Sequence, residues 1–109
     1  MAVEIEVHGR VSFVFPATGK TFSFSELVNL LGRSISIYEL EGQSRHDHER
    51  AYYVVTSRNA QKAGREKNDT ATSIYAPFMK GLTDRVVYGN ILVCTVDELE
   101  SNELQALAG

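Results

Sequence analysis

The sequence predicts an α+β fold: a small mixed or antiparallel sheet of four to six strands, with two or three helices packed mainly on one face. Three observations predict it. Apolar and polar residues alternate in several short segments, helical patterns with capping residues lie between those segments, and a strongly apolar run precedes the acidic C-terminus. With 109 residues, the chain has the length of a single domain with one core, so we assign residues 1–109 to one domain.

The first two strands are predicted from alternation. Apolar side chains occupy only odd positions in two consecutive runs: Val3, Ile5, Val7, Val11, Phe13 and Phe15. A hairpin with the three-residue loop 8–10 pairs Val7 with Val11 and Ile5 with Phe13, which keeps both sets on one face. One long strand through Gly9 would give the same parity. We favour the hairpin because glycine is common in tight loops.

A turn and a helix follow. Pro16-Ala17-Thr18-Gly19 has the composition of a turn. Ser23 and Glu26 have the spacing of a capping box, so a helix is expected to begin near Phe24. Its buried stripe and its C-terminal cap are expected at Leu27, Leu30, Leu31 and Gly32. The alternation and β-branching of residues 34–40 then predict a strand.

The second half contains a loop, strands and two further helices. Residues 41–50 are polar and predict a loop, whereas residues 51–56 are apolar on both faces and predict a central strand. Asn68 or Asp69 is expected to cap a short helix that Pro77 ends or kinks. Residues 86–88 and 91–96 predict a last strand or strand pair, and Ser101 is expected to cap a terminal helix.

Composition excludes several classes of protein. The 11 basic and 14 acidic residues give a net charge of −3, which argues against a strongly cationic nucleic-acid binder. No apolar run approaches the roughly 20 residues that a membrane helix needs, so we expect no membrane partner. Cys94 is the single cysteine and cannot form an internal disulfide, which favours a cytoplasmic location.

Motifs with known chemistry are incomplete. Gly19-Lys20-Thr21 lacks the upstream glycine of a phosphate-binding loop, because Val14 occupies that position. His46 and His48 have the spacing of a metal-ligand pair, but a solvated loop accounts for them and no third ligand is evident. Cys94 lies in an apolar run without a neighbouring base and is expected to be a core residue. We therefore expect no enzyme activity and no cofactor.

Charge is segregated along the chain. Residues 51–96 contain six basic and three acidic side chains, whereas residues 97–109 contain four acidic ones and no basic one. A solvated basic loop explains this pattern. The alternative is an anion site, where cations meet the start of the next helix and hydroxyl and amide groups assist. Its candidate ligand-binding residues are Arg58, Lys62, Arg65, Asn68, Thr70 and Thr72.

Two further patterns carry a resemblance to a known family. Asn68-Asp69-Thr70-Ala71-Thr72 is followed by Asp84 and by an apolar segment around a glycine, residues 87–93. Upstream, Pro16-x-x-Gly19 precedes the segment 25–32 and Ile35-x-Ile37. Over most of residues 11–99 the chain resembles a family of small uncharacterised domains encoded by bacteriophages and bacterial mobile elements. It departs from them in having Gly32-Arg33 in place of a glycine pair, and in a longer, more basic connection before Asn68.

Two functions follow as expectations. The first is a small non-enzymatic accessory or binding module of phage or mobile-element origin, which acts through a host protein partner. That origin is what the resemblance implies, and the absence of a catalytic set accords with it. The second is a binder of a phosphate-bearing small molecule or nucleic acid at the basic 58–72 segment. A small sheet also leaves edge strands, so a homodimer formed through an edge or a face is a further expectation.

Overall fold

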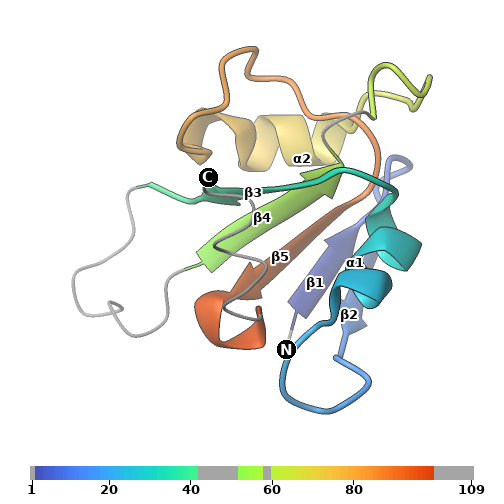
Figure 1. Ribbon diagram of the computed structural model, residues 1–109. Helices are drawn as coiled ribbons and strands as arrows, with labels where there is room; N and C mark the ends of the chain where they lie inside the picture. Colours follow the sequence, from blue (N-terminus) through green and yellow to red (C-terminus); the bar gives the residue numbers. More distant parts are fainter. Residues whose placement is uncertain (1, 42–51, 58–59, 100–109) are drawn as a thin grey trace.

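The computed structural model describes residues 2–41, 52–57 and 60–99, which form a five-stranded antiparallel sheet with a helix on each face (Figure 1). The strands lie in the order β2-β1-β5-β4-β3. The fold is therefore α+β, and the sheet is antiparallel throughout. The elements are β1 (Ala2–Ile5), β2 (Val11–Val14), α1 (Phe24–Leu31), β3 (Ile35–Glu39), β4 (Tyr52–Ser57), α2 (Asp69–Ile74), β5 (Ile91–Thr95) and the short 3-10 helices η2 (Ala76–Phe78) and η3 (Val96–Glu98).

The N-terminal hairpin forms with the predicted parity but in a different register. Ile5 pairs with Val11, and Val3 pairs with Phe13, so the odd-numbered side chains share one face as expected. The predicted pairing of Val7 with Val11 is wrong by two residues. Val7 instead donates its backbone N–H to Oδ1 of Asn90, 3.1 Å away, and so leaves the β1–β2 ladder. The loop itself is closed locally: the Gly9 N–H donates to the Glu6 carbonyl and the Glu6 N–H to the Arg10 carbonyl, both at 2.9 Å, and Gly9 has a φ of 88°.

Helix α1 begins and ends where local chemistry predicts. The Ser23 hydroxyl accepts from the Glu26 N–H at 3.2 Å, and the Glu26 carboxylate accepts from the Ser23 N–H at 3.1 Å. These two bonds complete the capping box. At the other end, Gly32 has a φ of 105°, a conformation that favours glycine, and its N–H donates to the Val28 carbonyl at 2.8 Å.

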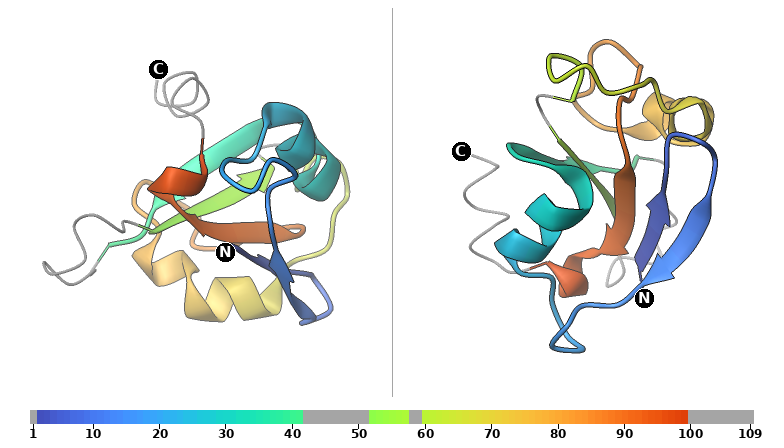
Figure 2. Two further views of the ribbon diagram at one scale, coloured as in Figure 1. Left: turned by 90° about the horizontal axis from the view of Figure 1, so that it is seen from below. Right: turned by 90° about the vertical axis from the view of Figure 1, so that its right-hand side faces the viewer.

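The helices lie on opposite faces of the sheet rather than mainly on one (Figure 2). Leu27 and Leu31 of α1 pack in one cluster with Val55 and Leu92. Ala71 of α2 packs in the other, whose strand members are Val3, Ile5, Tyr38, Val54, Ile91 and Val93. Adjacent residues of a strand point to opposite faces. Because β4 and β5 are apolar at consecutive positions, both of their faces need a cover.

Four predicted segments of the second half have different outcomes. Residues 86–88 form no strand of the sheet, although Tyr88 makes an isolated antiparallel bridge with Lys67. Pro77 lies inside η2, which follows α2 after Tyr75, so the α-helix ends before the proline as its chemistry requires. The predicted loop at 41–50 lies almost wholly outside the described residues, and the predicted terminal helix lies outside them entirely.

The side-chain amide of Asn68 joins three parts of the fold. Its Nδ2 donates to the Ile5 carbonyl at 3.0 Å and to the Gly89 carbonyl at 2.9 Å. Its Oδ1 accepts from the Ala71 N–H at 3.0 Å, which caps α2. Asn68 is fully buried. One side-chain amide therefore forms hydrogen bonds with β1, with the segment before β5 and with the first turn of α2, at the point where the β1–β5 ladder ends.

Cys94 lies in the core beneath α1. It is 1% exposed and belongs to the same cluster as Leu27 and Leu92. Burial raises the pKa of its thiol to about 12, and the nearby Glu98 carboxylate acts in the same direction. A thiol held in this way is neutral at physiological pH, as expected for a core cysteine.

We predict that Asn68→Ala lowers the free energy of unfolding by about 3 kcal/mol, because it removes a helix cap and leaves two buried carbonyls without a donor. Asn68→Asp should cost at least as much as Asn68→Ala: the carboxylate keeps the cap but cannot donate to Ile5 and Gly89, and it places a buried negative charge beside their carbonyl oxygens. Urea denaturation monitored by circular dichroism would measure both changes.

The matched control is Asn29→Ala, on the exposed side of α1. It should change the free energy of unfolding by no more than about 0.5 kcal/mol. If Asn68→Asp were as stable as the wild type, the two donated hydrogen bonds would contribute little, and the cap alone would explain why an asparagine stands at this position.

We also predict that the thiol of Cys94 weakens the fold at high pH. In the unfolded chain the thiol has its ordinary pKa of 9.0, whereas the folded thiol stays protonated up to about 12. Between these values the folded state binds more protons, so stability falls as pH rises, by up to about 1.4 kcal/mol per pH unit. The difference in denaturation midpoint between wild type and Cys94→Ala should therefore depend on pH above 9.0 and be constant below it.

Candidate functional site

The six residues predicted to bind an anion have different environments. Arg58 lies outside the described residues. Asn68 is buried, and both of its side-chain polar atoms are engaged in the hydrogen bonds that join β1, Gly89 and α2. Thr72 lies over residue 87, where its hydroxyl accepts from the Val87 N–H at 3.0 Å. The side chains of Asn68 and Thr72 thus form hydrogen bonds within the fold.

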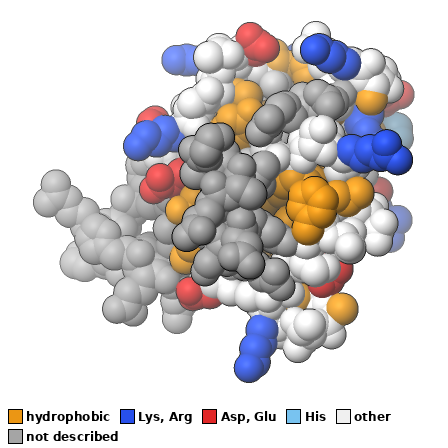
Figure 3. All heavy atoms as spheres, viewed as in Figure 1, with side chains coloured by type: hydrophobic (Ala, Val, Ile, Leu, Met, Phe, Trp, Pro, Cys, Tyr) orange, Lys and Arg blue, Asp and Glu red, His pale blue; other side chains and the backbone are white. Residues whose placement is uncertain are grey.

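The other predicted residues lie nearer the surface. Thr70 lies beside the β1–β2 loop, its Oγ1 3.6 Å from the position that a Cβ on Gly9 would occupy. Lys62 is exposed. Lys67, a neighbour in the basic segment, pairs with Asp69 at 3.6 Å, and both side chains are more than half exposed. On the face seen in Figure 3, Lys and Arg side chains lie at several separate places rather than in one patch.

Arg65 is the member of the predicted set with a defined path across the fold. Its side chain crosses Gly89, where an added Cβ would lie 3.1 Å from Arg65 Cδ. Its guanidinium reaches Gly32 at the end of α1, where an added Cβ would lie 2.9 Å from Arg65 Nη2. Both glycines have positive φ. Two glycines far apart in sequence therefore make room for one arginine, next to the carbonyl end of α1, where a cation is favourable.

Arg65 shares a cavity of about 500 Å³ with Arg33, a residue that no sequence pattern marked. The cavity lies between the end of α1 and the end of β4, and its other lining residues are Val28, Gly32, Ser57 and Ala63. The Ser57 hydroxyl donates to the Arg33 carbonyl at 2.6 Å and so ties the residue after α1 to β4. Two guanidinium groups around one space can bind an anion. Arg33 follows the helix-capping glycine, but only the tertiary fold brings it to Arg65.

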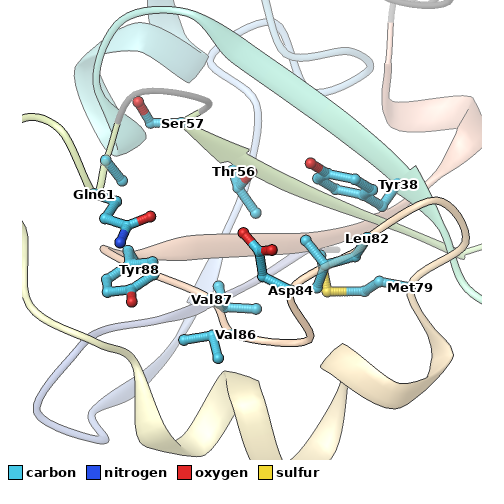
Figure 4. Close-up of a pocket in the computed structure, with 11 residues that line it drawn as sticks. Tyr38, Thr56, Ser57, Gln61, Met79, Leu82, Asp84, Val86, Val87 and Tyr88 are labelled. Atoms are coloured by element: carbon cyan, nitrogen blue, oxygen red, sulfur yellow. The ribbon is translucent and has the colours of Figure 1, made fainter.

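A second cavity, of about 130 Å³, lies on the other face of the sheet (Figure 4). Its floor comes from β3 and β4, and its cover comes from residues 79–88. The lining is mixed: apolar side chains accompany polar ones, among them Tyr38, Thr56, Gln61, Asp84 and Tyr88. No sequence pattern marked this group, because its members come from four separate segments.

The edge strand β2 exposes large apolar side chains. Val11 is 56% exposed, and Phe13 and Phe15 are each 67% exposed. They lie on the α2 side of the sheet, since Val11 and Phe13 pair with Ile5 and Val3. β2 borders only β1, so one of its long edges has no strand partner among the described residues. A contiguous exposed apolar stripe on an open edge is typical of an interaction surface.

Side-chain groups typical of metal centres are absent from the described part of the chain. Among those residues, no group of three His, Cys, Asp or Glu side chains is placed to hold a metal ion. The His46 and His48 pair lies outside them. Within residues 2–41, 52–57 and 60–99, no helix has both the length and the apolar character needed to cross a membrane.

Comparisons with known proteins give no family assignment. The chain matches no protein-family model, and no match was found among curated proteins or among solved structures. The resemblance to phage and mobile-element domains therefore stays a prediction.

Proposed function

We propose that this chain is a non-enzymatic binding module that acts through a protein partner, and that the partner docks on the edge of β2. The observation that supports this proposal is the exposed apolar stripe of Val11, Phe13 and Phe15 on that edge. The resemblance to phage and mobile-element domains favours a host protein as the partner and the cytoplasm as the place where the two meet.

The backbone of β2 is suited to strand addition. The Glu6 N–H donates to the Arg10 carbonyl at 2.9 Å, so residues 6 and 10 form a hydrogen-bonded pair. Such pairs alternate along an antiparallel ladder. Ser12 and Val14 therefore face β1 with their backbone groups, whereas Val11 and Phe13 direct theirs away from the sheet. The β2 residues with exposed apolar side chains are thus the ones with outward N–H and C=O groups.

This arrangement defines the chemistry of the partner. An extended segment laid along β2 would pair with the outward backbone groups, and its alternate side chains would pack on Val11, Phe13 and Phe15. Residues 11–15 carry no charge, and Arg10 and Pro16 bound them. The partner segment is therefore expected to be extended, apolar at every second position and uncharged at its centre.

We predict that Phe13→Lys abolishes partner binding without unfolding the protein. A lysine on an exposed edge position costs little stability, but its charge opposes both strand addition and apolar packing. The measurement is quantitative mass spectrometry of proteins captured from a host lysate by wild type and variant. It is followed by hydrogen exchange with the purified partner, which should protect the amides of Val11 and Phe13.

Phe78→Lys is the matched control, because Phe78 is 51% exposed and lies in η2 instead of β2. It should leave capture and protection unchanged. Protection of β2 amides that appears in the isolated protein as its concentration rises, with a doubled mass in light scattering, would show that a homodimer occupies this edge instead. A partner that protects other segments and tolerates Phe13→Lys would contradict the proposal.

A second candidate function is the binding of a phosphate-bearing ligand, and the cavity that Arg33 and Arg65 share supports it. The ligand's phosphate would lie between the two guanidinium groups, which suit bidentate hydrogen bonding. Lys62 is three residues from Arg65 and adds a positive charge to the same exposed segment. Asn68 and Thr72 would support the site indirectly, by holding the segment that follows.

For this candidate we predict a rise in melting temperature with inorganic pyrophosphate. At ten times Kd, mass action stabilises the fold by about 1.4 kcal/mol, which corresponds to about 6 °C for a domain of this size. The double variant Arg33→Gln/Arg65→Gln should lose the rise. The charge-matched control Lys20→Gln/Lys80→Gln, at exposed positions outside the cavity, should keep it. Equal rises in both variants would reject the arginine site.

A further inference from the structure

The second cavity results from uneven cover on the α2 side of the sheet. α2 has only six residues, and its cluster centres on β1, β5 and the middle of β4. Beyond η2, the irregular segment 79–88 covers the rest. It is held at one end by the Lys80 N–H, which donates to the Glu39 carbonyl at 2.9 Å. At the other end, the Asn68 N–H donates to the Val87 carbonyl at 2.7 Å. The segment is thus fixed over β3 and β4 without filling the space between.

The cavity has polar groups where the rest of this face has apolar ones. Thr56 is 6% exposed and forms part of the floor, and Tyr38, two residues from its partner Ser36 on β3, also lines the cavity. Figure 4 shows the Asp84 carboxylate near the middle of the cavity, with Tyr38 and Tyr88 on opposite sides of it and Thr56 above it. Gln61 adds an amide beside Tyr88.

The backbone at residue 85 places Asp84. Arg85 has a φ of 55°, in the left-handed region that few residues other than glycine adopt. Asp84 and Val86 both line the cavity, while Arg85 between them does not. A conformation of this kind is unfavourable for a residue other than glycine and is retained where the surrounding structure requires it. Here it turns an acidic side chain toward the cavity and a basic one away from it.

The charge in the cavity lining is negative. Asp84 is the charged residue among those that line it, and no described cation forms an ion pair with Asp84. Aromatic rings and a carboxylate are the groups that bind organic cations, through the negative faces of the rings and through charge-assisted hydrogen bonds. The volume, about 130 Å³, corresponds to roughly four water molecules at about 30 Å³ each. The space therefore suits a small headgroup.

We propose that this cavity is a binding site for a small organic cation, of the size of a guanidinium or a methylated ammonium group. The cation is held by the Asp84 carboxylate between Tyr38 and Tyr88. The site lies on β3 and β4, at the opposite edge of the sheet from β2, so it does not depend on the partner proposed for the β2 edge. Its ligand is also opposite in charge to that of the two-arginine cavity.

The test is a titration of the ¹⁵N-labelled protein with tetramethylammonium chloride or guanidinium chloride, both below about 50 mM, with sodium chloride at equal ionic strength as the reference. We expect saturable shifts of the amide signals of Gln61, Asp84 and Tyr88 with an organic cation and not with sodium. Asp84→Asn should weaken binding tenfold or more. Asp97→Asn, the same change at an exposed position outside the cavity, should bind as the wild type does.

Two aromatic variants make the test independent of Asp84. Tyr88→Phe keeps a ring face and should retain tetramethylammonium binding, whereas Tyr88→Leu should lose it. The dispersion of the amide spectrum shows whether each variant is folded. Shifts that stay linear over the whole titration in the wild type, or that are equal in Asp84→Asn, would overturn the proposal. So would equal binding by Tyr88→Leu and Tyr88→Phe.

Discussion

The fold depends on how one buried amide closes the end of the β1–β5 ladder. The β1–β5 ladder ends at the pair of Ile5 with Ile91, and the buried Asn68 side chain lies at this end, between β1 and the segment before β5. Asn68 donates to the Ile5 and Gly89 carbonyls and accepts from the first turn of α2. Buried backbone groups without partners are costly, so a residue with two donors and one acceptor is required there. This requirement places α2, and with it the cover of one face.

The surfaces available for binding follow from that placement. α2 is short and covers β1, β5 and part of β4, so two regions on its side of the sheet lack a helix. At one edge, β2 exposes Val11, Phe13 and Phe15. At the other, residues 79–88 lie over β3 and β4 and border a small cavity, to whose lining the exposed Asp84 contributes. The length of α2 is limited by Pro77, which ends the α-helical stretch.

The candidate sites differed in how far they could be predicted. The apolar alternation of Val11, Phe13 and Phe15 was evident from the sequence, and so was their shared face. Their exposure was not, because an apolar alternation normally indicates a buried face. Arg65 could be singled out as a cation, but its partner Arg33 could not, since the two are distant in the sequence. The cavity around Asp84 gathers residues from four segments, which no local pattern relates.

Local sequence determined the features that depend on neighbouring residues: the capping box at Ser23 and Glu26, the glycine at the end of α1, the cap at Asn68 and the parity of the hairpin. These features depend on hydrogen bonds between residues close in the sequence, or on the alternation of side chains along a strand. Tertiary structure joined the hairpin loop to the segment before β5, through Val7 and Asn90, and placed the helices on opposite faces. Both outcomes depend on long-range contacts, which form only when distant segments share one core.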